Sequence, residues 1–311
     1  MNRSKIAGIG YYVPERVVTN DDLTKVMDTT DEWIQERTGI RERRYGKKHE
    51  ETTTTMAAAA ARIACERAGI QPQEIDFIVF ATLSPDYYFP GCGVLLQREL
   101  GITSQEAGAL DIRNQCSGFL YGLATASGLV RSGAAKHVLV VGAETHSAAL
   151  DFSTRGRSVT SLFGDGAGAV VVSGTDEDKG IRHFKLGADG RYADTLALKV
   201  WDIRKRPYIP VNERGNGEVD PVMLWPQMEG KTVFKNAVER MIGGLMECCS
   251  EAGITGTDID FFLFHQANLR INQYVQQTLG IPDEKCIHNI QKFGNTTAAT
   301  LKIISMEDST P

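Results

Sequence analysis

The stretch AGIQPQEIDFIVF occupies residues 68–80, and residues 252–264 read AGITGTDIDFFLF. The two stretches share AGI, an Ile-Asp-Phe triplet and a final Phe at identical offsets. Each copy follows a segment with helical periodicity, Met56 to Arg67 in one case and Val233 to Glu251 in the other. Each copy then passes through a turn into an apolar, strand-like run. An internal repeat of this kind predicts a chain built from two related halves.

The register of the repeat continues further along both halves. Each half carries a helical segment that ends in Leu-Gly-Ile, at Ile102 in the first and at Ile281 in the second. Cys116 lies 14 residues after Ile102, and Asn295 lies 14 residues after Ile281. Equivalent points of a duplicated fold meet near its pseudo-twofold axis, so we expect Cys116 and Asn295 to lie close together.

Three further apolar, β-branched runs predict strands: Lys5 to Val13, His137 to Gly142 and Ala167 to Ser173. These runs are almost continuously hydrophobic, which is typical of strands that are buried on both faces. Their alternation with helical segments predicts an α/β protein whose sheets are covered by helices. We therefore expect a layered α/β/α/β/α body.

The boundary between the halves is expected at the polar, glycine-flanked segment 174–180. The first half, residues 1–175, then carries Cys116, and the second half, residues 176–311, carries His265 and Asn295. Residues 187–225 are rich in glycine, proline and charge and predict a long excursion near a ligand mouth.

Composition excludes several classes of protein. Hydrophobic residues make up 42% of the chain and charged residues 23%, which are values of globular proteins. A net charge of -5 argues against nucleic-acid binding. No apolar stretch approaches the roughly 20 residues that a membrane span needs, and the first residues lack the apolar core of a signal peptide. The six cysteines form no CxxC pair or zinc-ligand spacing. We expect a cytoplasmic protein without a metal.

Cys116 lies in DIRNQCSGFLYGLATASGLV, where a polar segment gives way to an amphipathic helix that begins at about Ser117. The free N–H groups and the dipole at a helix N-terminus favour a thiolate over a thiol. Gly118 permits close approach of a substrate. An arbitrary cysteine is most often a buried core residue, but the helix start and the register of the repeat favour a nucleophile.

His265 ends an apolar run in FFLFHQANLR, and Asn295 lies in KFGNTTAAT, before a predicted helix. Taken singly, such a histidine is usually structural and such an asparagine is usually a cap or turn residue. Together with Cys116 they supply one thiolate and two hydrogen-bond donors. Such a trio can accept an acyl group and stabilise an enolate oxygen, although the residues alone do not exclude the hydrolysis catalysed by a cysteine protease.

Five segments in order resemble the β-ketoacyl-acyl carrier protein synthase III family: DEWIQERTGIRERR (31–44), QCSGF (115–119), LFGDGAGA (162–169), HQANLRIN (265–272) and FGNTTAAT (293–300). The similarity runs from about Ile6 to Lys302. It implies a duplicated, five-layered thiolase-type fold and a homodimer. It also implies condensation of an acyl-coenzyme A starter with malonyl-acyl carrier protein, with loss of carbon dioxide and without a permanently bound cofactor.

The same resemblance implies roles for individual residues. Cys116 would be acylated, while His265 and Asn295 would polarise the malonyl thioester carbonyl. The remaining assignments are Trp33 stacking on the adenine of coenzyme A, Arg37 and Arg157 contacting its nucleotide or phosphates, Asn268 near the pantetheine arm, Phe89 reaching the acyl pocket of the partner subunit, and Arg270, with the basic run 41–44, docking the carrier protein. The glycine-rich segment 162–169 is followed by a β-branched run rather than a helix, so it predicts a structural loop instead of a nucleotide site.

The chain departs from the family pattern at its end. Family members continue after TAATLK through a helix and two buried strands with a glycine-rich stretch, whereas residues 303–311 here read IISMEDSTP. We therefore expect the second half to be incomplete, because it would lack the usual C-terminal segment. Alternatives to the condensing enzyme are a thiolase-fold acyltransferase of specialised metabolism with another acceptor, and an inactive truncated homologue.

Overall fold

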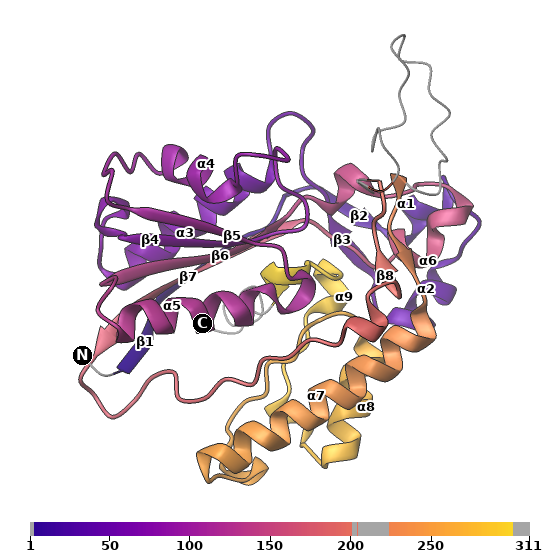
Figure 1. Ribbon diagram of the computed structural model, residues 1–311. Helices are drawn as coiled ribbons and strands as arrows, with labels where there is room; N and C mark the ends of the chain where they lie inside the picture. Colours follow the sequence, from indigo (N-terminus) through magenta and orange to yellow (C-terminus); the bar gives the residue numbers. More distant parts are fainter. Residues whose placement is uncertain (1–2, 201–203, 205–223, 301–311) are drawn as a thin grey trace.

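The computed structural model describes residues 3–200, 204 and 224–300 (Figure 1). The first sixteen helices and strands, in chain order, run as follows: β1 Arg3–Tyr12, β2 Val17–Thr19, α1 Asn20–Thr24, α2 Asp31–Thr38, β3 Glu42–Arg44, α3 Thr53–Ala68, β4 Phe77–Ala81, α4 Cys92–Glu99, β5 Gly108–Ile112, α5 Gly118–Arg131, β6 His137–Glu144, α6 Arg157–Thr160, β7 Gly166–Thr175, β8 Leu196–Ala197, β9 Gln227–Met228 and α7 Gly230–Ala252. They are followed by α8 Leu269–Leu279 and α9 Ile290–Phe293.

A five-stranded mixed sheet forms the centre of the first half, in the order β1-β7-β6-β4-β5. Strand β7 pairs antiparallel with both β1 and β6, while β4 is parallel to both β6 and β5. The three runs that the sequence predicted as strands are thus β1, β6 and β7, and the first copy of the repeat ends in β4. Those predictions are confirmed.

Helices cover both faces of this sheet (Figure 1). Successive side chains of a strand point to opposite faces. Accordingly Ile78 and Phe80 of β4 pack against α3 and α4, whereas Val79 packs against α5. All three side chains are fully buried, which explains why the strand is apolar at every position.

Small residues allow α3 to lie directly on β1. Its buried face is lined by alanines, among them Ala60 and Ala64. A Cβ atom added at Gly8 or at Gly10 would lie 2.1 Å from the carbonyl oxygen of one of these alanines. Glycine is therefore required where β1 passes beneath the helix, since any side chain would displace the helix backbone.

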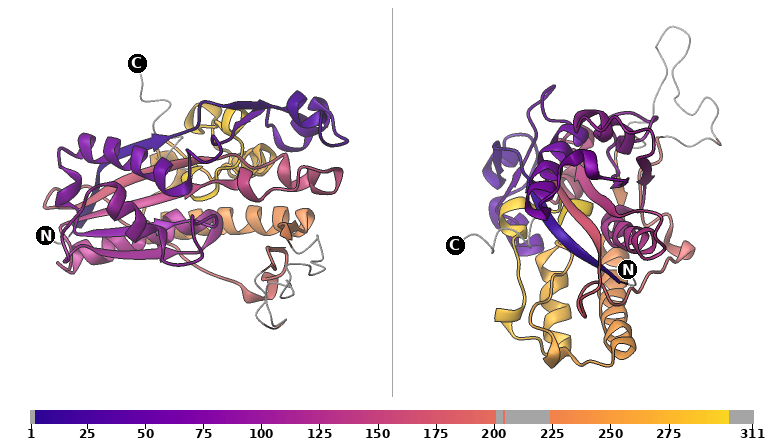
Figure 2. Two further views of the ribbon diagram at one scale, coloured as in Figure 1. Left: turned by 90° about the horizontal axis from the view of Figure 1, so that it is seen from above. Right: turned by 90° about the vertical axis from the view of Figure 1, so that its left-hand side faces the viewer.

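The second half is built around α7 and α8, which lie side by side (Figure 2). Val238 of α7 and Val275 of α8 enclose a small core together with Phe262 and Phe264. The second copy of the repeat was expected to form a strand. Within the described residues it forms only a single parallel bridge, between Phe262 and Cys286. The second sheet of the expected layers is therefore not formed in the part of the chain that the structure describes.

Two expectations concern residues outside the described ranges. The predicted excursion 187–225 is described only at 187–200, 204 and 224–225, and the C-terminal segment 301–311 is not described. Strand β7 ends at Thr175. The division into halves 1–175 and 176–311 stays a prediction. None of the helices in the described ranges is both long enough and apolar enough to cross a membrane.

Candidate active site

Cys116 lies where the chain passes from β5 into α5, the helix that packs on one face of the sheet. It belongs to a 3₁₀ turn, Gln115–Ser117, that leads from β5 directly into α5. Gln115 has φ +45°, a conformation that is uncommon for a residue with a side chain and that marks a tight bend at the cysteine. A Cβ atom at Gly118 would lie 3.0 Å from the Cβ of Ala81 and 3.8 Å from that of Ala298. The helix start predicted for Cys116 is confirmed.

The environment of the thiol differs from the expectation of a ready thiolate. Burial, with a smaller contribution from the nearby carboxyl group of Glu144, raises the pKa of Cys116 to about 12. Hydrogen bonds to the sulfur from the backbone N–H of Cys116 and from the side chain of Asn295 act in the opposite direction and are outweighed. The helix dipole gives only a fraction of a charge, so desolvation dominates and the resting group is a thiol. The prediction of a resting thiolate was wrong.

Asn295 reaches this thiol from the second half, as the register of the repeat predicted. Its backbone joins the glycine-rich loop of the first half. The N–H of Asn295 donates to the Leu162 carbonyl oxygen at 2.8 Å, and the N–H of Gly164 donates to the Asn295 carbonyl oxygen at 3.1 Å. Its Oδ1 accepts the N–H of Thr297 at 2.8 Å. The helix expected after Asn295 is only the short 3₁₀ turn Thr297–Ala299 within the described residues. Of the segment 162–169, residues 162–165 form a structural loop, as predicted, which holds Asn295, and residues 166–169 already belong to β7.

His265 follows the bridge-forming segment of the second half and precedes α8. Within the described part of the chain neither of its buried ring nitrogens has a hydrogen-bond partner. Burial lowers the pKa of His265 to about 4, so the ring is neutral near pH 7. The structure therefore gives no hydrogen bond from His265 to Cys116 or Asn295. A neutral imidazole with free nitrogens remains able to donate one N–H to a bound molecule.

Glu144 is a site residue that the sequence reading missed. It ends β6, is fully inaccessible to solvent, and accepts hydrogen bonds from Leu83 N–H at 3.1 Å and from Ser84 Oγ at 2.7 Å. Burial raises the pKa of this carboxyl group to about 7 in spite of these hydrogen bonds. A charged residue at the end of the otherwise apolar run HVLVVGAE was the available signal.

Three of the residues assigned to coenzyme A lie together at the surface. The guanidinium carbon of Arg37 lies 4.7 Å from the centre of the Trp33 ring, and that of Arg157 lies 4.9 Å from it. Arg157 also donates to the Asp28 carbonyl oxygen at 2.8 Å. Two cations against one indole create a positive, aromatic surface that suits a nucleotide carrying phosphates.

Asn268 joins this cluster through structural hydrogen bonds. Its Oδ1 caps α8 by accepting Arg270 N–H at 2.9 Å, and its Nδ2 donates to the Arg37 carbonyl oxygen at 2.9 Å. The side chain of Arg270 is exposed. The basic run 41–44 was expected to help in docking, but for Arg43 this was wrong. Its guanidinium is completely buried and donates to the carbonyl oxygens of Val18 at 3.2 Å and Ser161 at 2.9 Å.

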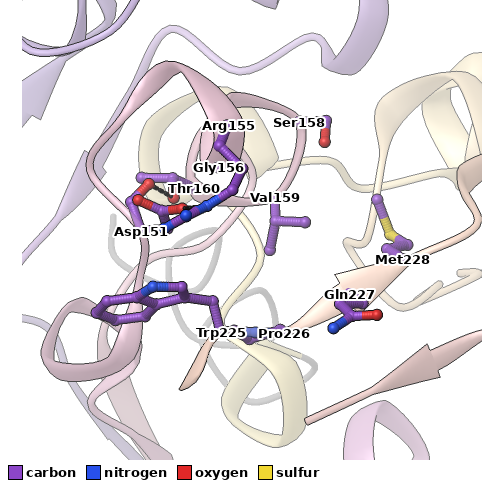
Figure 3. Close-up of a pocket in the computed structure, with 10 residues that line it drawn as sticks. All are labelled: Asp151, Arg155, Gly156, Ser158, Val159, Thr160, Trp225, Pro226, Gln227 and Met228. Atoms are coloured by element: carbon purple, nitrogen blue, oxygen red, sulfur yellow. Dashed lines mark hydrogen bonds and ion pairs between the residues drawn. The ribbon is translucent and has the colours of Figure 1, made fainter. Parts of the chain in front are cut away.

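A pocket of about 220 Å³ is lined in part by Gly156 and Ser158, the chain neighbours of Arg157 (Figure 3). Arg155 Nε is bound to Asp151 Oδ2 at 2.6 Å on one side of the pocket, and Trp225 lies on the other. The pocket is lined by Asp151, Arg155, Gly156, Ser158, Val159, Thr160, Trp225, Pro226, Gln227 and Met228. Arg155 was missed in the sequence reading, although it stands two residues before Arg157 in STRGR.

Phe89 lies in the loop after β4 and is 80% exposed. Tyr87 and Tyr88 beside it are also exposed. The ring of Phe89 meets that of Tyr88 edge to face, with centres 6.3 Å apart. The loop thus presents three aromatic side chains to solvent.

In the described residues, no group of three or more His, Cys, Asp or Glu side chains could hold a metal ion.

Comparisons with known proteins connect this chain to one enzyme family. Residues 110–190 match the family model for 3-oxoacyl-(acyl-carrier-protein) synthase III, and residues 249–308 match the model for its C-terminal part. A relative from Halalkalibacterium halodurans, β-ketoacyl-(acyl-carrier-protein) synthase III 1, is 40% identical over 308 residues, which cover 99% of this chain and 90% of the relative.

Solved structures agree. That of 3-oxoacyl-(acyl-carrier-protein) synthase III from Aquifex aeolicus aligns with a TM-score of 0.85 at 40% identity, covering 98% of this chain and 90% of the other. A priming β-ketosynthase of a polyketide biosynthetic pathway aligns with a TM-score of 0.84 at 35% identity, covering 97% and 86%. The predicted thiolase-type α/β fold is confirmed.

Proposed function

Since the chain belongs to the 3-oxoacyl-(acyl-carrier-protein) synthase III family, we propose that it joins an acyl-coenzyme A starter to malonyl-acyl carrier protein and so initiates fatty acid or related acyl-chain synthesis. One observation carries the proposal. The side chain of Asn295, from the second half, hydrogen bonds to the sulfur of Cys116 at the start of α5. An acyl-accepting sulfur therefore lies beside a donor that can stabilise a developing oxyanion.

The first half-reaction acylates Cys116. Its sulfur attacks the thioester carbonyl, the bond from that carbonyl to the sulfur of coenzyme A breaks, and the thiol proton leaves with the departing thiolate. The hydrogen bonds from Cys116 N–H and Asn295 stabilise the sulfur as it loses its proton.

The second half-reaction forms the carbon–carbon bond. Loss of carbon dioxide from the malonyl thioester leaves an electron pair as an enolate, whose carbon attacks the acyl group on Cys116. The carbon–sulfur bond then breaks, and the Cys116 thiolate that leaves takes up a proton from water to restore the thiol. His265, neutral because its pKa is about 4, and Asn295 are the donors that we assign to the enolate oxygen. Loss of one such donor typically costs about 2.7–4 kcal/mol.

The cluster of Trp33, Arg37 and Arg157 is the site we assign to the nucleotide of coenzyme A. An adenine can stack on the indole where one guanidinium now lies, and the displaced cation can then meet phosphate oxygens. The adjacent pocket, with Arg155, extends this surface. Asn268 is assigned to the pantetheine arm, which would approach α8 at its capped end. The coenzyme is a substrate here, and we propose no permanently bound cofactor.

We further propose a homodimer built along β5. This strand is an edge of the sheet, and Leu110 on it is exposed. Unpaired edges of this kind invite pairing with a second strand. The neighbouring aromatic loop would then place Phe89 against the partner's acyl pocket. Light scattering after size exclusion should give twice the chain mass, and Leu110→Lys should give the single mass. Met246→Lys, at a more exposed site far along the chain on α7, should stay dimeric.

Arg270, exposed at the start of α8, is assigned to docking of the acidic carrier protein.

We propose a cytoplasmic location, because all six cysteines are free thiols and a reducing compartment keeps them so.

The test is intact-mass spectrometry after incubation with a panel of acyl-coenzyme A thioesters. One acyl mass should be added to the protein, and the addition should be lost in Cys116→Ala but retained in Cys286→Ala, a control at another partly buried cysteine. His265→Ala should still be acylated but should condense at least about 100-fold more slowly. Undiminished acylation of Cys116→Ala would overturn the nucleophile, and normal condensation by His265→Ala would overturn the donor.

A second candidate is a priming acyltransferase of specialised metabolism. The similarity to the polyketide priming β-ketosynthase favours it. The two candidates share the acylation of Cys116 and differ in the acceptor. Release of carbon dioxide from malonyl-acyl carrier protein of fatty acid synthesis supports the first. Acylation without any condensation on that carrier supports the second.

A further inference from the structure

His146 is a partly buried histidine outside the trio assigned to catalysis, and it reaches the same loop as Asn295. It follows β6 in the first half, at the start of the 3₁₀ turn His146–Ala149. Its Nε2 lies 2.7 Å from Oγ1 of Thr297, 151 residues further along the chain. Burial lowers the pKa of His146 to about 3, so the ring is neutral and its contact is a hydrogen bond rather than an ion pair.

Thr297 has an unusual backbone conformation that serves Asn295. Its φ is +51°, in the left-handed region that a β-branched residue rarely adopts. A residue held there costs about 1–3 kcal/mol and persists only when its surroundings fix it. In this conformation the N–H of Thr297 donates to Asn295 Oδ1 at 2.8 Å. The hydrogen bond to His146 is the side-chain contact that anchors Thr297.

The orientation of the Asn295 amide decides what it can do. An asparagine side chain presents an acceptor at Oδ1 and donors at Nδ2. Because Oδ1 accepts the N–H of Thr297, Nδ2 is the atom left to donate, and a side-chain hydrogen bond from Asn295 lowers the pKa of the Cys116 thiol. A rotated amide would place Nδ2 against the N–H of Thr297 and turn the acceptor oxygen toward the site, where it would repel an enolate oxygen.

The same histidine supports the other side of Asn295. Its ring lies 4.5 Å from that of Phe163, tilted by 40°. The backbone of Phe163 forms a parallel bridge with Asn295. Beneath this loop, a Cβ atom at Gly142 of β6 would lie 2.4 Å from the Ala298 carbonyl oxygen, so the turn Thr297–Ala299 rests directly on the sheet. The loop therefore has no room to relax toward β6 once the hydrogen bond is removed.

We propose that His146 is a positioning residue that, through Thr297, fixes the amide of Asn295 as a donor and thereby sets the rate of condensation. This inference rests on the proposed function. It deepens that function by adding the hydrogen-bonded pair of His146 and Thr297, which has no role in the mechanism proposed above. The effect falls mainly on the second half-reaction. During acylation the Cys116 sulfur is also stabilised by its own backbone N–H, whereas the enolate oxygen is assigned only the donors Asn295 and His265.

The experiment compares the two half-reactions in matched variants. His146→Phe keeps an aromatic ring against Phe163 but removes the hydrogen bond, and His146→Gln restores a polar side chain. In His146→Phe, kcat for condensation should fall about 10- to 100-fold, a part of the loss expected when a donor is removed altogether. The rate of Cys116 acylation and KM for the acyl-coenzyme A should change less than about threefold, and His146→Gln should recover much of kcat.

A double-mutant cycle tests whether the effect passes through Asn295. In an Asn295→Ala background, His146→Phe should slow condensation no further. Thr297→Val and Thr297→Ser repeat the comparison at the other end of the hydrogen bond and replace the histidine variants if those fail to fold. Condensation at the normal rate in His146→Phe or Thr297→Val overturns the inference. So does an equal loss in both half-reactions, which would indicate a structural role only. Failure of the unsubstituted protein to condense would instead overturn the proposed function.

Discussion

Glu144→Gln should change how the stability of the protein depends on pH. The carboxyl group of Glu144 is buried at the end of β6, where it accepts hydrogen bonds from the segment Thr82–Ser84. Burial raises its pKa from 4.5 to about 7. The folded protein therefore holds a proton on Glu144 between about pH 4.5 and pH 7, whereas the unfolded chain has released it.

The sign follows from proton binding. Where the folded state binds more protons than the unfolded state, the free energy of unfolding falls as pH rises. A pKa raised from 4.5 to about 7 corresponds, at ~1.4 kcal/mol for each pH unit, to about 3 kcal/mol lost between pH 4 and pH 8. The other titratable group coupled to it in the site, Cys116, stays a thiol throughout this range because its pKa is about 12.

Glutamine keeps the shape of Glu144 and one acceptor oxygen but cannot ionise. The difference in unfolding free energy between variant and unsubstituted protein should therefore move by about 3 kcal/mol in favour of the variant from pH 4 to pH 8. Urea unfolding at both values, with fixed ionic strength, measures this difference while cancelling groups common to both proteins. Glu177→Gln is the control. Lys179 and Lys5 hold the pKa of this exposed carboxyl below its usual value, so its removal should give no such gain. A difference for Glu144→Gln that is the same at both pH values would refute the reasoning.

Three substitutions, with Gly128→Ala as the control for the first, test other parts of the structure. Gly142→Ala places a Cβ 2.4 Å from the Ala298 carbonyl oxygen, so it should lower the free energy of unfolding by about 1–3 kcal/mol and slow condensation. Gly128→Ala, in open space on α5, should not destabilise the protein in urea unfolding. Trp33→Ala should raise KM for acyl-coenzyme A roughly tenfold in steady-state assays, because stacking on an aromatic ring is worth about 1–3 kcal/mol for a base. Arg43→Met should lower the unfolding midpoint, because two buried carbonyl oxygens lose their donor.

Four of the five strands of the first sheet could be predicted, because β1, β4, β6 and β7 lie in mostly apolar runs, whereas β5, on which Leu110 is exposed, was not predicted. Strand β4 shows the reason. Val79 packs under α5 while Ile78 and Phe80 pack under α3 and α4, so no position faces water and the run reads as continuous. Glycines at 8 and 10 were visible in the sequence, but their contact with α3 was not. Which helix crosses which strand depends on the order β1-β7-β6-β4-β5, in which β1 lies beside β7 and β6 beside β4 although neither pair is consecutive in the chain.

In the site, the repeat predicted the meeting of Cys116 and Asn295, since equal offsets in two related halves give equivalent positions. Ionisation could not be predicted in the same way. The pKa of Cys116 depends on burial and on Glu144, which approaches from another strand. Similarly, Arg43 looked like surface charge because its neighbours in the chain are charged, yet the protein buries it beneath Ser161. Local sequence shows which groups are present but does not give the dielectric around them.

The two copies of the repeat show why a strand is a property of its neighbours. Phe77–Ala81 pairs with β6 on one side and with β5 on the other, so its backbone groups lie between two strands with which they can form hydrogen bonds. Asp260–Phe264 has the same apolar pattern, but in the described residues only Phe262 is bridged, to Cys286. Phe261 is consequently 61% exposed, whereas its counterpart Phe77 packs into the core beneath α5. An apolar run thus predicts that a segment can join a sheet, and hydrogen-bonded neighbours decide whether it does.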